Sequence, residues 1–378
     1  GRKYLIFDAL WRPVVEQTLD LGNVSGTLSE VIKRYDVQGR VEFQSYPMNT
    51  NGLANYADTT LKGVWTDYDA LDRVTSVSQD SELGLLTTLT EYLSGFKTRV
   101  TPPKGAAWQA TTSYMAYDQP SYDWPTAITH PEGALTDIAR DVFGKPTSLT
   151  RRNAANSAWM RKYWAYDPYQ RVCKFTEVET GTTAYGYDEA GNLIWSAGGL
   201  SWSPPAPCER TFENVATRRV DRTYDARNRI KTLSFPNGLG NTTYAYTPDG
   251  LPSSVVTDNG ATDGQATINY AYNKRRLITR ETLITPQLNW PYDYGYNANG
   301  HLAVNNWHGL SIDYAPNALG QPTKAGTYAS GVSYYPNGAL KQFTYGNGIV
   351  HTMTQNARQL PSRSTDSVTG STPLDLGY

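Results

Sequence analysis

The sequence has little of what enzymes use for chemistry. Its 378 residues hold 2 Cys and 4 His. Cys173 and Cys208 lie in no CxxC motif, so the spacing typical of zinc sites is absent. The two cysteines form a disulfide if the protein is exported or remain thiols if it is not, and the sequence leaves both states open.

Basic stripes and long apolar runs are absent too. The chain has 34 Lys and Arg against 35 Asp and Glu, and its basic residues gather in groups of three at most. A nucleic-acid surface needs a basic stripe, so we expect no nucleic-acid partner. No run of 18 apolar residues is present, which argues against a membrane-spanning helix. No signal peptide is visible.

Catalytic motifs are missing as well. The segment "FGKPTS" at 143–148 resembles a phosphate-binding loop, but Ala139 stands where that loop has its first glycine. No G-x-S-x-G nucleophile motif occurs. We therefore predict that the protein is not an enzyme, with no catalytic residues, no cofactor-binding residues and no metal site.

What the sequence does have is one short pattern, seen in "YDEAGNLIWS" at 187–196. Tyr187 suits a pleated, half-buried strand. The Asp188 carboxylate can accept a hydrogen bond from the backbone two residues on and so begin a turn. Gly191 reaches positive φ without a Cβ clash and lets the chain reverse. The pattern predicts a strand, a tight turn and a returning strand.

Thirteen copies of this pattern follow one another. Their first, usually aromatic, positions are Phe7, Tyr35, Tyr68, Arg140, Tyr166, Tyr187, Tyr224, Tyr246, Tyr272, Tyr296, Pro316, Tyr334 and Thr354. An Asp comes next in seven copies, at Asp8, Asp36, Asp69, Asp141, Asp167, Asp188 and Asp225. A glycine stands four residues after the first position at Gly39, Gly144, Gly191, Gly250, Gly300, Gly320 and Gly338. Val, Leu, Ile or Pro stands six residues after it in every copy, so the sequence predicts a repeat architecture.

Two positions of the repeat, four and five residues after the first, lead to further predictions. Where the glycine is replaced, Asp72 and Asn228 tolerate the left-handed conformation. Trp11, Gln170, Arg276 and Arg358 do not adopt it readily, so we expect another turn type or strain there. We expect the arginines of the next column to pair with acidic or aromatic neighbours rather than to bind phosphate. They are Arg12, Arg40, Arg73, Arg171 and Arg229.

The best-preserved copies are "YDVQGRV" at 35–41, "YDALDRV" at 68–74 and "YDARNRI" at 224–230. They are similar to the YD repeats of bacterial Rhs proteins, which also occur in Tc toxin components and teneurins. The resemblance implies a β-sheet wound into a hollow shell that encloses a toxic C-terminal domain. The family's self-cleaving D-P-x-G element has no counterpart here, because the one Asp-Pro, at 167–168, belongs to a repeat.

The fold we predict is all-β, with tandem antiparallel hairpins of five- to eight-residue strands in a spiralling or curved single-layer sheet. A second family of turns, "PPKG", "HPEG", "FPNG", "TDNG" and "YGNG", is expected at the other strand ends. We expect one region over residues 1–378, with a possible inserted loop at 198–209 and a positive φ at Gly191, Gly250 and Gly300.

Two functions remain open. The first is a non-catalytic shell segment that encapsulates or carries a toxin and is exported by a bacterial secretion system. The second is a module that binds carbohydrate or a cell surface through exposed Tyr and Trp; a hydrolase is a remote third. Expected partners are further repeats of a longer parent or a partner chain, the enclosed toxin domain, or copies of the chain associating edge to edge, because outer strands such as "KYLIF" at 3–7 are unprotected.

Overall fold

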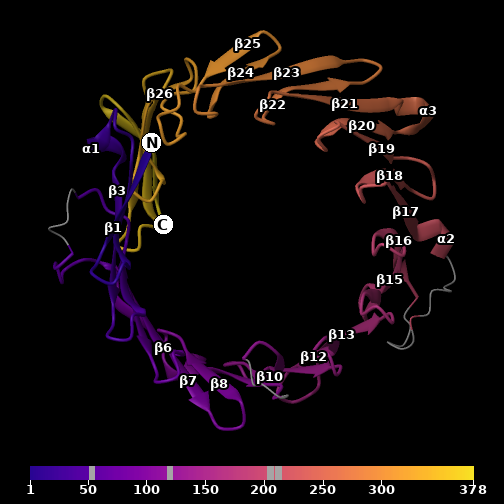
Figure 1. The fold of residues 1–378 in the computed structure, drawn as a ribbon, viewed down its shortest axis with the longest axis horizontal. Helices are drawn as coiled ribbons and strands as arrows, with labels where there is room; N and C mark the ends of the chain where they lie inside the picture. Colours follow the sequence, from indigo (N-terminus) through magenta and orange to yellow (C-terminus); the bar gives the residue numbers. More distant parts are fainter. Residues whose placement is uncertain (51–55, 117–121, 202–207, 209–214) are drawn as a thin grey trace. The chain divides into compact units, whose positions relative to one another are not determined.

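The computed structural model describes residues 1–50, 56–116, 122–201, 208 and 215–378. Across these residues the chain is almost entirely β-strand (Figure 1). The helices described are one turn each: α1 (Val24–Thr27), η2 (Ala106–Trp108), α2 (Val215–Arg218) and α3 (Gly260–Asp263). Strands that follow one another in sequence pair antiparallel, so the predicted all-β fold of tandem hairpins is confirmed.

The chain forms two compact units. The first comprises Gly1–Thr90 and Tyr292–Tyr378. Its N-terminal strands are β1 (Arg2–Phe7), β2 (Pro13–Leu19), β3 (Ser29–Tyr35), β4 (Val41–Ser45), β5 (Gly63–Tyr68), β6 (Val74–Ser81) and most of β7 (Gly84–Leu93). Its C-terminal strands are most of β23 (Asn289–Tyr296), then β24 (Leu302–Trp307), β25 (Leu310–Asp313), β26 (Ala329–Tyr334), β27 (Leu340–Tyr345), β28 (Val350–Gln355), β29 (Pro361–Val368) and β30 (Ser371–Gly377). Strands β26–β30 form a separate sheet of five strands.

The second unit is Glu91–Pro291. Its strands up to residue 200 are β8 (Lys97–Thr101), β9 (Ala110–Tyr114), β10 (Pro125–Thr129), β11 (Leu135–Arg140), β12 (Pro146–Arg152), β13 (Trp159–Tyr166), β14 (Val172–Glu177), β15 (Gly181–Tyr187) and β16 (Leu193–Leu200). They are followed by β17 (Arg219–Tyr224), β18 (Ile230–Ser234), β19 (Asn241–Tyr246), β20 (Pro252–Asp258), β21 (Gln265–Tyr272) and β22 (Ile278–Ile284). The unit boundaries fall inside strands β7 and β23.

Each unit has a small apolar core. Val14, Val15 and Ile32 pack together in the first unit. In the second, Trp195 packs with small and aliphatic neighbours of strands β15 and β16. Cross-strand pairs supply further contacts, such as the rings of Phe43 and Trp65, whose centroids lie 4.4 Å apart. Such pairs contribute roughly 0.2–1 kcal/mol each, so stability is spread along the sheet.

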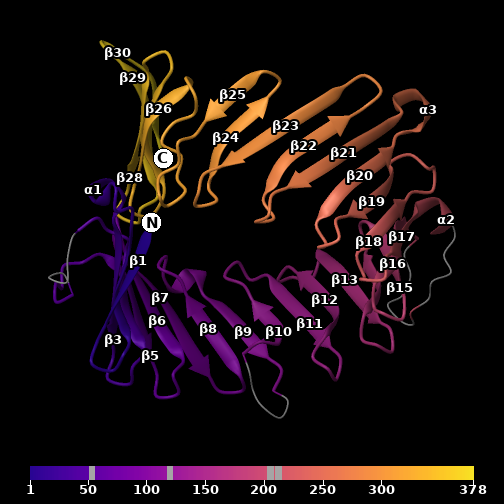
Figure 2. The same cartoon turned by 45° about the horizontal axis from the view of Figure 1, so that its top comes forward.

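In the first unit, the two ends of the chain meet. Helix α1 lies beside strand β26 in both ribbon views (Figures 1 and 2). The Ala318 backbone N–H donates to the Asp20 carboxylate at 2.9 Å. Arg358 donates to both carboxylate oxygens of Glu82. Three successive C-terminal turns, at 317–320, 335–338 and 356–359, line or contact this region.

The φ angles at the turn positions test the predicted turn geometry. Gly191, Gly250 and Gly300 have φ of 86°, 94° and 86°, which confirms their expected conformation. Asp72 and Asn228 are left-handed, as expected. Trp11, Gln170 and Arg276 also adopt φ between 61° and 64°, so these turns keep the common geometry and carry the strain.

The frame predicted for the last copy of the repeat is wrong by one residue. The last turn uses Asn356, whose backbone N–H donates to Leu360, and Gln359 is left-handed at φ 60°. The first position of that copy is therefore Gln355 rather than Thr354, and Arg358 does not occupy the glycine position. The polar segment "MTQNAR" fits either frame by composition, and the carboxamide of Asn356 decides between them because it caps the turn.

Two further expectations fall partly on residues outside the described ranges. Of the possible loop at 198–209, residues 198–200 end strand β16, and 202–207 and 209 are not described. The segment "YDQPSYDWPTAI" at 117–128 resembles a worn copy of the pattern, and its residues 117–121 are not described. The expectation of one uninterrupted repeat region stays a prediction.

Candidate functional site

The feature that recurs along the chain is the turn after each aromatic position, which we call the YD turn. At Asp36 the carboxylate Oδ1 accepts hydrogen bonds from the backbone N–H groups of Gln38 and Arg40, at 3.0 and 2.9 Å. The backbone closes the turn through Gly39 N–H to the Asp36 carbonyl. The residue order dictates this geometry, since a short acceptor begins the turn and a left-handed residue ends it.

The arginine that follows the turn connects one repeat to the next. Arg40 Nε donates to the second carboxylate oxygen of Asp36 at 2.7 Å. Its guanidinium lies over the ring of Tyr68, 4.7 Å from the centroid, and donates to the Asp69 carbonyl at 2.9 Å. Other copies stack a cation in the same way: Arg12 over Tyr35, Lys145 over Tyr166, Arg171 over Tyr187 and Arg229 over Tyr246. The expected pairing of these arginines with acidic and aromatic neighbours is confirmed.

The aromatic residue makes a second link. The Tyr68 hydroxyl donates to the Val41 carbonyl at 2.9 Å. Seven more phenols donate to the residue six positions after the preceding aromatic position: Tyr35 to Pro13, Tyr166 to Pro146, Tyr187 to Val172, Tyr224 to Leu193, Tyr246 to Ile230, Tyr272 to Pro252 and Tyr334 to Pro322. Each bond contributes roughly 0.5–1.5 kcal/mol. We call this set of contacts, from turn to arginine to next tyrosine, the repeat clasp.

The clasp also sets the charge state of its aspartates. The Arg229 side chain, and then its backbone N–H, lower the pKa of Asp225 to about 2. The Arg73 side chain lowers the pKa of Asp69 in the same way. At Asp188 the Asn192 side chain takes the place of arginine and lowers the pKa. These carboxylates are therefore ionised at neutral pH and accept hydrogen bonds within their turns.

The sequence did not indicate the phenol-to-carbonyl bond. It showed that the sixth position is Val, Leu, Ile or Pro, which fits a strand start but says nothing of a backbone acceptor. The constant six-residue offset was the available signal. Its meaning needed the register of the strands, in which Tyr68 pairs with Val74 while its hydroxyl reaches back to the preceding repeat.

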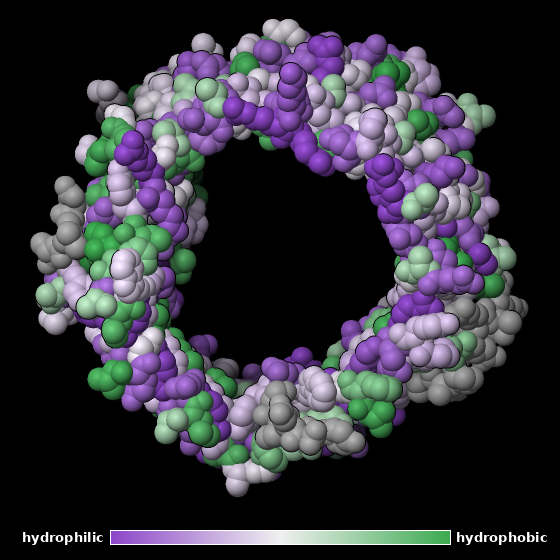
Figure 3. Space-filling model, viewed as in Figure 1, coloured by the Kyte–Doolittle hydropathy of each residue, from purple (hydrophilic) through white to green (hydrophobic). Residues whose placement is uncertain are grey.

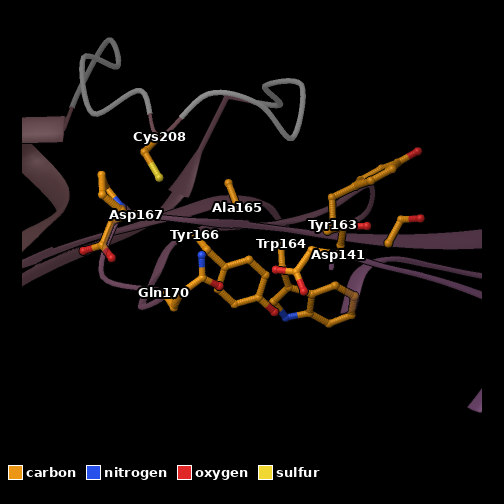
Figure 4. A pocket seen from close by; sticks show the side chains of 11 residues that line it. Asp141, Tyr163, Trp164, Ala165, Tyr166, Asp167, Gln170 and Cys208 are labelled. Carbon is orange, nitrogen blue, oxygen red and sulfur yellow. The ribbon is translucent and has the colours of Figure 1, made fainter. Parts of the chain in front are cut away.

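A pocket of about 790 Å³ lies in the second unit (Figure 4). Its lining is Asp141, Thr147, Ser148, Tyr163, Trp164, Ala165, Tyr166, Asp167, Pro168, Gln170 and Cys208. Asp141 and Asp167 both cap YD turns, since each carboxylate accepts a hydrogen bond from the backbone N–H four residues on. The Gln170 Oε1 atom is buried without a hydrogen-bond partner in the described part of the chain.

A disulfide joins Cys173, fully buried in β14, to Cys208. This settles the alternative that the sequence left open. It ties the connection between β16 and α2 to the sheet of the second unit.

The described residues hold no group of three His, Cys, Asp or Glu side chains placed to bind a metal ion. Within the same ranges, no helix has the length and apolar character needed to cross a membrane.

The chain is thus built as a tandem β-hairpin repeat protein. It is similar to a structure of TcdB2-TccC3, with 12% identity and a TM-score of 0.43. The match covers 98% of this chain and 24% of the other. It is also similar to the Photorhabdus luminescens Tc holotoxin pore carrying the TccC3-D651A mutation, with 12% identity and a TM-score of 0.28, over 99% of this chain and 25% of the other. The chain spans about a quarter of these proteins' length.

No family model matches the chain. No curated protein matches it either.

Proposed function

We propose that this chain is a non-catalytic segment of a YD-repeat shell that encloses or carries a toxin domain. The repeat clasp is the observation that carries the proposal. It links each hairpin to the preceding one through a backbone carbonyl, and the same bond occurs eight times in the described residues. Such a device makes a long, continuous wall out of short strands.

Two further observations support it. The Asp36, Asp141 and Asp167 carboxylates each accept a backbone hydrogen bond within a turn, as groups with a structural role do. The disulfide fits a protein that works in an oxidising compartment, as an exported shell does.

Protease protection tests the proposal. The full-length parent protein should shield its enclosed domain from trypsin under conditions that digest the same domain expressed alone. A parent in which Tyr68, Tyr224 and Tyr246 are all changed to Phe should lose part of that protection, because three clasps are weakened. Equal digestion of the domain in the intact parent and alone would contradict enclosure.

A second candidate is carbohydrate binding at the pocket of the second unit. Tyr163, Trp164 and Tyr166 supply rings there, and the unpartnered Gln170 Oε1 offers an acceptor for a hydroxyl. Binding to a glycan array that is lost in Trp164→Ala and kept in Trp108→Ala, an exposed Trp elsewhere, would favour this function.

A further inference from the structure

The YD turns of the first unit lie along one edge of its N-terminal sheet. Consecutive strands are antiparallel neighbours, so alternate connections fall at opposite ends of the strands. The turns β1–β2, β3–β4 and β5–β6 are YD turns and share what we call the YD edge. The connections β2–β3, β4–β5 and β6–β7 share the opposite edge. Adjacent YD turns touch, since Arg40 Nη1 pairs with the Asp72 carboxylate at 2.7 Å.

The YD edge here carries large apolar side chains that are exposed in the described part of the chain. Leu10, Trp11, Val37 and Leu71 stand at the tips of these three turns and are 70%, 82%, 97% and 71% exposed. We call these four residues the apolar tip row. Figure 3 shows apolar residues gathered on the visible face near β1, β3 and α1, whereas polar residues predominate over β22–β25. Contiguous apolar surface of this kind marks an interaction site on a soluble protein.

The turn itself does not require apolar tips. Its geometry needs the Asp acceptor and a left-handed residue. Leu10, Val37 and Leu71 lie between these positions and contribute neither, while Trp11 fills the left-handed position that glycine takes in other copies. Several later YD turns place small or polar residues at these positions, such as Glu189 and Ala190 or Ala298 and Asn299, whereas Val142 and Phe143 in the second unit are 74% and 61% exposed. Within the first unit, the exposed apolar tips belong to the N-terminal turns.

The first unit already shows what YD turns dock against. The C-terminal YD turns contact the opposite edge of β1–β7: Ala318 binds Asp20 in the β2–β3 connection, and Arg358 binds Glu82 in the β6–β7 turn. Gln359 Nε2 donates to the Pro47 carbonyl in the β4–β5 connection at 2.7 Å. A row of YD turns thus fits a row of opposite-edge connections.

The C-terminal strands of the same unit have an opposite edge of their own. Its turns are "WHGL" at 307–310, "YGNG" at 345–348 and "VTGS" at 368–371, and none contains Asp, Glu, Lys or Arg. Trp307, Leu310, Tyr345 and Val368 are all exposed there. This edge is uncharged and apolar like the tip row, whereas the edge that receives Arg358 carries Asp20 and Glu82.

We propose that the apolar tip row docks on the 307–310, 345–348 and 368–371 turns of a second copy of this chain. The contact repeats between molecules the edge-on-edge packing that the first unit makes within itself. Apolar tips meet an edge without acidic or basic residues, and the exposed Asp72 carboxylate beside Leu71 is paired with Arg40, so burial leaves no unpaired charge there. Because the two surfaces differ, the contact is head-to-tail, and a docked copy still presents both surfaces to further copies.

Native mass spectrometry and light scattering over a concentration series test this. The wild-type chain should form dimers and larger species as its concentration rises. The tip variant Val37→Asp with Leu71→Asp should be monomeric, and so should the edge variant Leu310→Asp with Val368→Asp. The matched control Ala226→Asp with Asn299→Asp adds the same charge at the same turn positions and should assemble like wild type.

Mixing the two defective variants gives the sharpest result. Each retains one intact surface, so an equimolar mixture should form one-to-one dimers and nothing larger. Because all the substituted residues lie at exposed or half-buried turn positions, circular dichroism should be unchanged. A wild-type chain that stays monomeric, a tip variant that assembles like wild type, or a mixture that forms no dimer would overturn the proposal.

A lipid surface is the alternative occupant. Wild-type chain that floats with neutral phosphatidylcholine vesicles but stays monomeric in solution, with flotation lost in the tip variant, would overturn the self-docking proposal in favour of a membrane.

Discussion

The early and late YD turns have the same backbone but different chemistry. At Asp36 and Asp69 a carboxylate caps the turn and pairs with the following arginine, and in the Asp36 turn that arginine reaches the next tyrosine. At Asn297, Asn317 and Asn356 a carboxamide oxygen accepts the same two backbone N–H groups, with no arginine at the pairing position. The turn therefore depends on an acceptor oxygen, whereas the charge is an addition that ties neighbouring repeats together.

Replacing the turn glycine should have the largest effect, and a larger one in the early region. Gly39→Val and Gly338→Val both force a β-branched residue to φ near 85°, which costs roughly 1–3 kcal/mol. A side chain at Gly39 would also meet Arg12 Nη1 at 3.4 Å, while the space at Gly338 is open. Hydrogen exchange should show the greater local loss of protection for Gly39→Val, and distant hairpins should be unchanged. Equal losses would mean that the arginine does not matter.

Removing the phenol hydroxyl should have the same effect in both regions. Tyr68→Phe and Tyr334→Phe each lose one bond to a backbone carbonyl, at about 0.5–1.5 kcal/mol. The ring remains in both variants, and in Tyr68→Phe the Arg40 guanidinium can still lie over it. Chemical denaturation followed by hydrogen exchange should give similar local losses, with the exposed Tyr378→Phe as a control that changes nothing. A loss confined to Tyr68→Phe would show that late repeats are not clasped.

Relieving strain should stabilise a turn. Arg276 is left-handed at φ 64° in a position that other copies give to glycine. Arg276→Gly removes about 1–2 kcal/mol of steric strain from the folded state. Glycine also gives the unfolded chain more conformational entropy, which offsets part of this gain, so the free energy of unfolding should rise by about 0.5–1 kcal/mol. Gly300→Ala, at a neighbouring turn, should lose stability instead. A destabilised Arg276→Gly variant would indicate that the side chain makes a contact worth more than the strain.

Lowering the pH should destabilise the Asp-capped turns before the Asn-capped turns. This should be the smallest of the four effects, because the ion pairs face solvent. The pKa of Asp225 falls to about 2 in the folded chain through Arg229, from an ordinary value near 3.8. A lowered folded pKa stabilises above the unfolded value, and that stabilisation is lost as the pH falls from about 4 toward 2. Pepsin cleavage mapped over this range should begin near 225–229 and spare the turn at 297–300. Asp225→Asn should abolish the pH dependence of that cleavage.

The sequence predicted the hairpins because their signals are local. Asp36 and Gly39 specify a reversal within five residues, and the same five residues form it in the structure. The arginine pairing was also local enough to infer from Arg40 beside Asp36. The contacts of Arg358 with Glu82 and of Ala318 with Asp20 were not predictable, since they join segments roughly 300 residues apart and leave no periodic trace. The frame of the last copy failed because "TMTQNARQL" lacks both aromatic and glycine.

The acceptor of every clasp is a backbone carbonyl, and this has a consequence for how such a gene can change. A carbonyl is supplied by any residue, including the prolines at 13, 146, 252 and 322. For this hydrogen bond, the tyrosine of one hairpin requires only that the strand of the preceding hairpin has the right length, and no particular side chain. Unequal crossing-over that adds or removes a whole hairpin pair leaves every remaining junction chemically complete. The length of the wall can drift by recombination while its joints stay intact.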